Sequence, residues 1–190
     1  ATYYSGTAWR GKAYKVAVPI TTSPYSEGLD VTYDTNPINW KLSTIFEDSK
    51  FPPISASFTV SVDYKTDAVW VYFGTGRYIV EADKTNGDQN YILGIKDPFY
   101  NRRGTLEGAT NTPACFHNYT GCSLSLDDLF WGDPYKIKTD GTVEVSTGGI
   151  STINTYDKLL QEINKKDTQG VEVYQGWYKK SGLRLQTNTV

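Results

Sequence analysis

The sequence predicts a mostly β protein with one short helix, and three observations lead to this prediction. Apolar and polar residues alternate in many short segments, which is the period of a half-buried strand. The 190 residues include 15 Tyr, 7 Phe and 5 Trp, and aromatic residues favour sheets. Turn signals such as Asn-Gly and Asp-Gly separate the segments, whereas a helical period occurs in only one place.

Eight segments are predicted as strands because they are rich in Val, Ile, Tyr, Trp and Thr. The clearest are residues 54–62, in which apolar and small polar residues alternate, and residues 68–73, a β-branched and aromatic run. The complete set is 12–18, 54–62, 68–73, 90–95, 134–138, 142–146, 171–178 and 183–190.

The links between these strands carry turn chemistry. Residues 63–67 separate two strands at hairpin distance. Asp140-Gly141 predicts a second hairpin, because this dipeptide tolerates the positive φ of a type I′ turn. Asn86-Gly87 indicates a similar turn.

The one predicted helix spans residues 155–166, where three aliphatic side chains fall on one face. Thr155 or Asn154 would cap its first turn, and the lysines in its last turn suit the helix dipole. A shorter helical turn is expected at residues 126–130.

Residues 99–133 hold few strand patterns and many Gly, Asn and Thr, which predicts a long insertion that projects from the sheet scaffold. Cys115 and Cys122, the only cysteines, are predicted to form a disulfide that closes part of this insertion. Such a disulfide implies an oxidising compartment. Two reduced thiols are the alternative, and a zinc site is disfavoured because one His and two Cys do not make a four-ligand set.

Short motifs of glycine and aromatic residues recur at residues 4–6, 72–76 and 175–177. Short antiparallel strands with repeated motifs of this kind are typical of β-propeller blades. Because a blade needs about 40–50 residues and a ring about 4–8 blades, the chain would supply about three blades. We therefore expect residues 1–190 to form one partial β-propeller, completed by further sequence or by a second chain.

Bulk properties exclude two classes of partner. The net charge of −2 provides no basic field for a phosphate backbone, so no nucleic-acid binding is expected. No apolar run approaches the roughly 20 residues needed to span a bilayer, so no membrane span is expected. The chain begins at Ala1 and contains no Met, which indicates a processed, trimmed or excised product.

Residues 83–90 contain the best candidate for a metal site. Asp83, Asn86, Asp88 and Asn90 place hard oxygen atoms close together around a glycine turn, which suits calcium. The loop is not an EF-hand, because no bidentate Glu stands at its position 12. A plain polar hairpin tip is the alternative.

Catalytic patterns are scarce, and the protein is predicted not to be an enzyme. A Ser-His-Asp triad would have to use His117, the only histidine, and no nucleophile elbow, zinc-protease motif or P-loop occurs. Asp127, Asp128 and Asp133, beside Trp131, form an acidic cluster that is interpreted as a solvated turn. Acids beside aromatic residues also occur in carbohydrate sites.

Five short motifs resemble, in order, the β-propeller domain of PilY/PilC-type pilus-associated proteins. Residues 69–79 resemble the VYFGTGRY signature, and residues 89–97 match the strand that follows it in the family. Weaker matches lie at residues 9–16, at 40–56 and at 176–178. The signature positions are Tyr72, Phe73, Gly74, Thr75, Gly76, Arg77, Tyr78, Gln89, Gly94 and Asp97, of which Arg77 is expected to pair with Asp83 or Asp97.

The resemblance implies an exported type IV pilus biogenesis or tip-associated factor, located at the pilus or cell surface, that acts by protein–protein or surface adhesion. Its partners would be pilin or other pilus components, or a host surface, and calcium tunes some members. The binding loop is expected at Phe116, His117, Asn118 and Tyr119, and Asn118 also fits a glycosylation sequon.

Two alternatives come from other classes of protein. One is a secreted propeller enzyme that acts on glycans, which a buried set of carboxylates in a pocket would favour. The other is a structural subunit of an extracellular fibre, in which neighbouring chains fill the open sheet edges.

Overall fold

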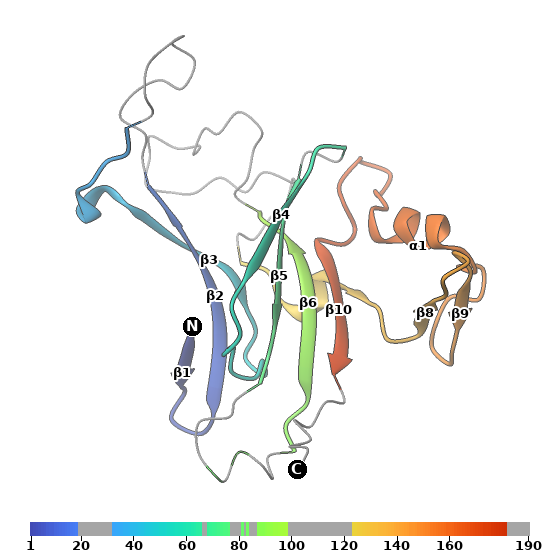
Figure 1. The fold of residues 1–190 in the computed structure, drawn as a ribbon, viewed down its shortest axis with the longest axis horizontal. Coiled ribbons are helices and arrows are strands. Elements are labelled where there is room, and N and C mark those ends of the chain that lie inside the picture. Colours follow the sequence, from blue (N-terminus) through green and yellow to red (C-terminus); the bar gives the residue numbers. More distant parts are fainter. Residues whose placement is uncertain are drawn as a thin grey trace.

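The computed structural model describes residues 1–18, 32–65, 68–76, 81, 83, 87–98 and 123–181. Within these residues the protein is mostly β, with one short α-helix and three sheets, none of which closes (Figure 1). The strands are β1 (Thr2–Tyr4), β2 (Trp9–Ala17), β3 (Lys41–Glu47), β4 (Thr59–Asp63), β5 (Ala68–Gly74), β6 (Asn90–Lys96), β7 (Phe130–Trp131), β8 (Tyr135–Ile137), β9 (Val143–Val145) and β10 (Gly176–Ser181). The helices are α1 (Tyr156–Ile163) and two 3₁₀ turns, Pro37–Asn39 and Leu126–Asp128.

The largest sheet has the strand order β4–β5–β6–β10–β7. The pairs β4–β5, β5–β6 and β6–β10 are antiparallel, whereas β7 lies parallel to β10. The register sets Phe73 opposite Leu93 and Leu93 opposite Tyr178, so these side chains share one face of the sheet. This face is apolar and packs inside the protein.

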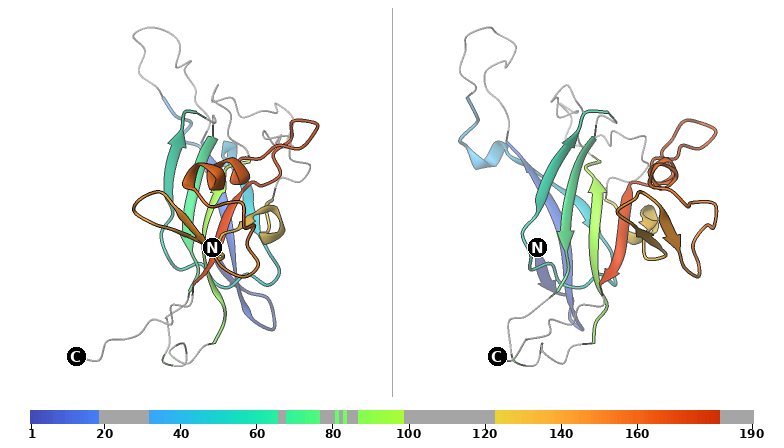
Figure 2. Two further views of the ribbon diagram at one scale, coloured as in Figure 1. Left: turned by 90° about the vertical axis from the view of Figure 1, so that its right-hand side faces the viewer. Right: turned by 45° about the vertical axis from the view of Figure 1, so that its right-hand side comes forward.

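The second sheet, β1–β2–β3, is antiparallel and packs against that apolar face (Figures 1 and 2). A β-bulge interrupts the pairing of β2 with β3 between Ala13 and Tyr14. Rings from the two layers meet edge to face, as in the pair Phe46–Phe73, whose centroids are 5.9 Å apart. The main core consists of Ala13, Ile45, Phe46, Phe51, Ile54, Val71, Phe73, Leu93, Ile95, Leu124 and Leu129.

A smaller core lies beside β10, where the β8–β9 hairpin and α1 pack together (Figure 1). The predicted hairpin is present, but its turn is not of type I′. The N–H of Gly141 donates to Lys138 O at 3.1 Å, and Gly141 has a φ of +81°. This geometry corresponds to a longer loop that ends in a glycine of positive φ.

Several sequence predictions are confirmed. Strands occupy residues 68–74 and 90–96, close to the predicted bounds, and the helical turn at Leu126–Asp128 is present. Helix α1 is capped by Thr155, whose Oγ1 accepts a hydrogen bond from the Lys158 N–H at 3.4 Å. It ends at Ile163, before the predicted lysines.

The predicted strand at residues 54–62 is wrong in its first half, because β4 begins only at Thr59. Ile54 is buried against the backbone of Gly11, where an added Cβ would lie 2.8 Å from Ile54 Cγ1. This stretch therefore packs across β2 as a connection.

The predicted strand at residues 171–178 is also displaced, since β10 begins at Gly176. Gly176 has a φ of +150°, and an added Cβ would lie 2.2 Å from Gly94 O. The chain enters the sheet through a conformation and a close approach that only glycine accepts. The predicted strand at residues 183–190 lies outside the described residues.

Residues 123–133 differ from the projecting insertion expected there. Leu124 is completely buried and bridges to Phe46 of β3, and Phe130 lies in β7 of the large sheet. Residues 99–122, which hold the rest of the expected insertion, lie outside the described residues. Within the described part of the chain, no helix has the length and apolarity to cross a membrane.

Candidate functional site: the charged end of β6 and the aromatic row

The end of β6 carries two consecutive charged residues, Lys96 and Asp97, and both are buried. Successive side chains of a strand point to opposite faces of the sheet. Each charge therefore needs a partner in a different layer of the protein. A buried charge without a partner would be strongly destabilising.

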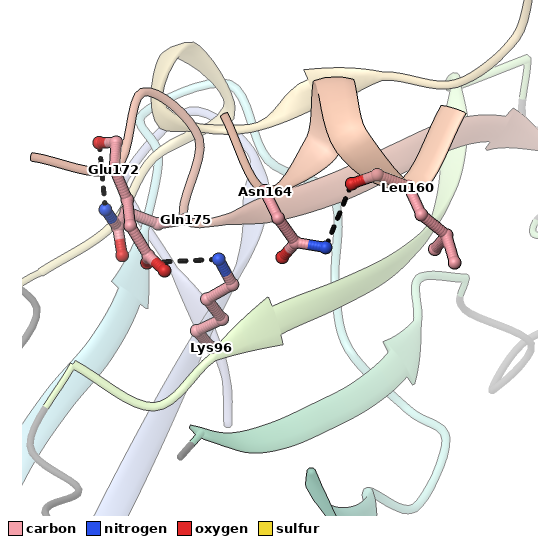
Figure 3. A network of polar contacts seen from close by, with 5 residues as sticks. All are labelled: Lys96, Leu160, Asn164, Glu172 and Gln175. Atoms are coloured by element: carbon pink, nitrogen blue, oxygen red, sulfur yellow. Dashed lines mark hydrogen bonds and ion pairs between the residues drawn. The ribbon is translucent and has the colours of Figure 1, made fainter. Parts of the chain in front are cut away.

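Lys96 is 0% exposed and projects away from the β1–β3 sheet. Its Nζ lies 3.0 Å from Glu172 Oε2 and 5.6 Å from the centre of the Trp70 ring (Figure 3). The backbone N–H of Lys96 donates to Gln175 O at 2.8 Å. The lysine thereby joins β6 to the segment that leads into β10.

Two amide side chains lie near this ion pair (Figure 3). Asn164, at the end of α1, donates from Nδ2 to Leu160 O at 3.0 Å, and Gln175 donates from Nε2 to Glu172 O at 3.3 Å. The buried acceptors Asn164 Oδ1 and Gln175 Oε1 have no hydrogen-bond partner among the described residues. Glu172 thus contacts both Lys96 and Gln175, whereas the described hydrogen bond of the Asn164 side chain is to its own helix.

Asp97, which is 4% exposed, faces the other layer. Lys15 of β2 places its Nζ 2.5 Å from Asp97 Oδ2, and the Asp97 N–H donates to Val69 O at 2.8 Å. The sequence prediction paired Arg77 with Asp83 or Asp97. Arg77 lies outside the described residues, and the cation described at Asp97 is Lys15.

An aromatic row lies on the same face of the large sheet as Lys96. The ring centroids of Trp70 and Tyr72 are 6.1 Å apart, and those of Tyr72 and Trp177 are 6.4 Å apart. Gly94 lies beneath this row, and a Cβ there would be 2.8 Å from both Tyr72 and Trp177. Burial, assisted by the charge of Asp63, raises the pKa of Tyr72 above its usual value.

The other described signature residues fasten the end of β5 to its neighbours. The Thr75 N–H donates to Tyr91 O at 2.9 Å, and Thr75 Oγ1 accepts from the Tyr91 N–H at 2.7 Å. Gly76, with a φ of +148°, donates its N–H to Pro53 O. Gln89 donates to Ser181 O at 3.3 Å. Tyr78 lies outside the described residues.

The candidate calcium ligands are described only in part. Asp83 is buried and Asp88 is exposed, and both take part in interactions. Asn90 Oδ1 accepts from Thr75 Oγ1 at 3.3 Å. Asn86 lies outside the described residues, so calcium binding stays a prediction. In the described ranges, no group of three His, Cys, Asp or Glu side chains is placed to hold a metal.

The acidic cluster has a structural explanation. Asp128 Oδ2 accepts from the N–H and the hydroxyl of Ser125, which caps the 3₁₀ turn. Asp133 accepts from Trp131 Nε1 at 2.6 Å and from the Lys180 N–H at 2.7 Å. The carboxylates of Asp128 and Asp133 therefore hold the local backbone and the Trp131 ring in place.

The predicted disulfide and binding loop lie outside the described residues. This applies to Cys115, Phe116, His117, Asn118, Tyr119 and Cys122 alike.

Sequence reasoning missed the buried Lys96–Glu172 pair. The available signal was a lysine directly after the apolar run Tyr-Ile-Leu-Gly-Ile, where a solvated charge is not expected. Its partner Glu172 lies in a segment with no pattern that would identify it. Since Lys96 is enclosed and ion-paired with Glu172, this pair ties two segments of the protein together.

Comparison with known proteins gives no relative. No protein-family model, no curated protein and no solved structure matches this chain.

Proposed function

We propose that the chain is an exported, non-enzymatic binding module of the PilY/PilC pilus-associated type. In this role it helps a type IV pilus to assemble or adhere, through contacts between proteins. The proposal rests on the ordered motifs of the sequence, which resemble those of that family, together with one arrangement in the fold.

That arrangement is the run of four antiparallel strands β4–β5–β6–β10, packed face to face on a second antiparallel sheet. Three of the motifs fall on strands that are neighbours in the sheet: the first signature on β5, the second on β6, and Gly176-Trp177-Tyr178 on β10. Four-stranded antiparallel sheets that stack face to face are the building unit of a propeller. The fold therefore supports a blade-like scaffold, and rigid scaffolds of this kind display binding loops.

The experiment is a binding measurement with purified proteins. The chain is immobilised, and the major and minor pilins of its own source organism are passed over it one at a time. We expect saturable binding to at least one pilin. Absence of binding to every pilin, by a chain that is folded by circular dichroism, would contradict the proposal.

Two variants sharpen this measurement. Phe116→Ala with Tyr119→Ala removes the aromatic side chains of the expected binding loop and should weaken pilin binding. Tyr33→Ala is the matched control, because Tyr33 is an exposed aromatic residue outside that loop. Equal affinity of both variants would assign the binding to another surface. Calcium is tested in the same assay by adding a chelator.

A further inference from the structure

Strand β4 is an edge strand that, within the described residues, has no lysine, proline, bulge or neighbouring strand to protect its outer side. Among the described residues no strand pairs with its outer side, and it is the outermost strand of the large sheet (Figure 2, left). Its residues, Thr-Val-Ser-Val-Asp, include no Lys and no Pro, and its pairing with β5 has no bulge. Proteins normally protect an exposed edge with one of these features.

The other described edges are less open. β1 has three residues and β7 has two. β3 is longer, but the Glu47 N–H donates to Leu124 O and the Leu124 N–H donates to Ile45 O, which covers part of its edge. β4 therefore stands out as a five-residue edge, with Val60 61% exposed and Val62 41% exposed.

The sequence of β4 is self-complementary about its central residue. If two copies pair antiparallel about Ser61, Ser61 faces Ser61, Val60 faces Val62, and Thr59 faces Asp63. Directly opposed β-branched residues stabilise a sheet, whereas directly opposed like charges destabilise it. In this register the two Asp63 carboxylates lie at opposite ends of the interface.

Aromatic residues flank the strand at its two ends. Phe58 precedes β4 and packs against Phe73 at 5.0 Å between centroids, and Tyr64 follows β4 in a turn. Both side chains are exposed in the single chain. In this register Tyr64 of one copy would end near Phe58 of the other, without lengthening the strand pairing.

We propose that the partner of the β4 edge is a second copy of this chain, which joins it in an antiparallel, two-fold symmetric pairing centred on Ser61. The two five-stranded sheets then form one continuous sheet across the symmetry axis. The interface closes on itself, because each copy uses its own β4 and leaves no β4 edge free. The product is a dimer and not a fibre.

The dimer does not depend on the proposed pilus role. Dimerisation would use the β4 edge, whereas pilin binding is expected at the loop of residues 116–119. Failure of the dimer would therefore leave pilin binding untouched, and failure of pilin binding would leave the dimer untouched.

Disulfide trapping tests the register directly. Residues directly opposite in an antiparallel pair have Cα atoms about 4.5–5.5 Å apart, and a disulfide requires less than about 7 Å. Ser61→Cys should therefore give a covalent dimer under mild oxidation, seen on a non-reducing gel. The wild-type chain, with its own two cysteines, provides the baseline.

Thr59→Cys is the matched control, since it lies on the same strand and is also exposed. In the proposed register the two Thr59 positions are offset by four residues, or about 14 Å, so they cannot be bridged. Both variants are first compared with the wild type by circular dichroism, to show that they fold. Equal trapping of both variants, or of neither, would overturn the proposal.

Light scattering on the unmodified chain provides the second measurement. We expect a mass of twice 21.3 kDa at high concentration, and a return to 21.3 kDa on dilution or with Val60→Lys and Val62→Lys. A monomer at every concentration, or a ladder of larger species, would contradict a closed dimer.

Discussion

Lys96 and Asp97 show how two adjacent residues can join three parts of a protein. The strand geometry sends their side chains to opposite faces, where Glu172 and Lys15 supply the opposite charges. An ion pair of this kind does not necessarily stabilise a fold relative to apolar residues. Loss of one partner is costly, because the other charge then remains buried alone.

The first prediction concerns this pair. Glu172→Ala should lower the free energy of unfolding by about 3–5 kcal/mol, because it leaves the Lys96 ammonium buried without its counter-charge. Urea denaturation measures this change. Glu144→Ala is the control, since its partner Lys138 is exposed and such pairs contribute about 0–1 kcal/mol.

A double variant separates the ion pair from packing. Lys96→Met with Glu172→Leu removes both charges and keeps most of the side-chain volume. We expect it to be more stable than Glu172→Ala. A double variant as unstable as the single one would contradict the view that the uncompensated charge causes the loss.

The second prediction concerns Gly94. Gly94→Ala should destabilise the fold by about 1–3 kcal/mol, because its methyl group would overlap Tyr72 and Trp177. Gly87→Ala is the control, since a Cβ there meets no described atom within 4 Å. We expect Gly94→Ala to have a lower melting temperature than Gly87→Ala in thermal unfolding. A lower melting temperature for Gly87→Ala would show that Tyr72 and Trp177 move aside at little energetic cost.

At the scale of single elements, α1 illustrates a helix start set by the residue that precedes it, its N-cap Thr155. Thr155→Ala removes the side chain that accepts the Lys158 N–H, and should cost about 1 kcal/mol. Thr155→Ser should retain most of the stability, because a serine hydroxyl caps equally well. Denaturant midpoints measure both variants, and equal losses would mean that the hydroxyl is not responsible.

Elements with a strong local signal could be predicted from the sequence. The apolar runs of β5 and β6, the cap of α1 and the Asp140-Gly141 hairpin are all encoded within a few residues. Residues 54–58 and 171–175 misled the prediction because their alternation is local, while their conformation depends on distant residues. Gly11 packs against the first segment, and Lys96 and Asp128 hydrogen-bond to the backbone of the second. Tertiary packing overrides β propensity in such segments.

The site was less predictable than the fold. Signature residues such as Gly94 were identified, but their role in packing appears only when β10 lies beside β6. The Lys96–Glu172 pair joins residues far apart in the chain, and no local pattern encodes such a contact. The unpaired outer edge of β4 likewise follows from the strand order of the sheet, which no local pattern encodes.

At the scale of the whole molecule, three partly buried tyrosines link stability to pH. Burial is the largest cause that raises the pKa of Tyr72, Tyr91 and Tyr178 above the ordinary value of 10.0. The unfolded chain therefore loses these protons at a lower pH than the folded protein does. Their contribution to stability is complete below pH 10.0 and falls as the pH rises further.

The corresponding measurement is urea unfolding across the alkaline range, with tyrosinate absorbance followed in parallel. We expect stability to decline above the ordinary phenol pKa, and Tyr91→Phe to reduce the slope of that decline. A stability that stays constant while the phenols ionise would contradict the prediction.

The position of β10 has a consequence for synthesis of the chain. Its partner β6 ends at Lys96, and β10 begins only at Gly176, so the ribosome must make all the residues between them first. Until then one edge of β6 has no partner strand in the nascent polypeptide, and long-range pairing of this kind is slow to form. Premature termination before Gly176 should therefore yield fragments that aggregate or recruit chaperones, even though most of the sheet has already been translated.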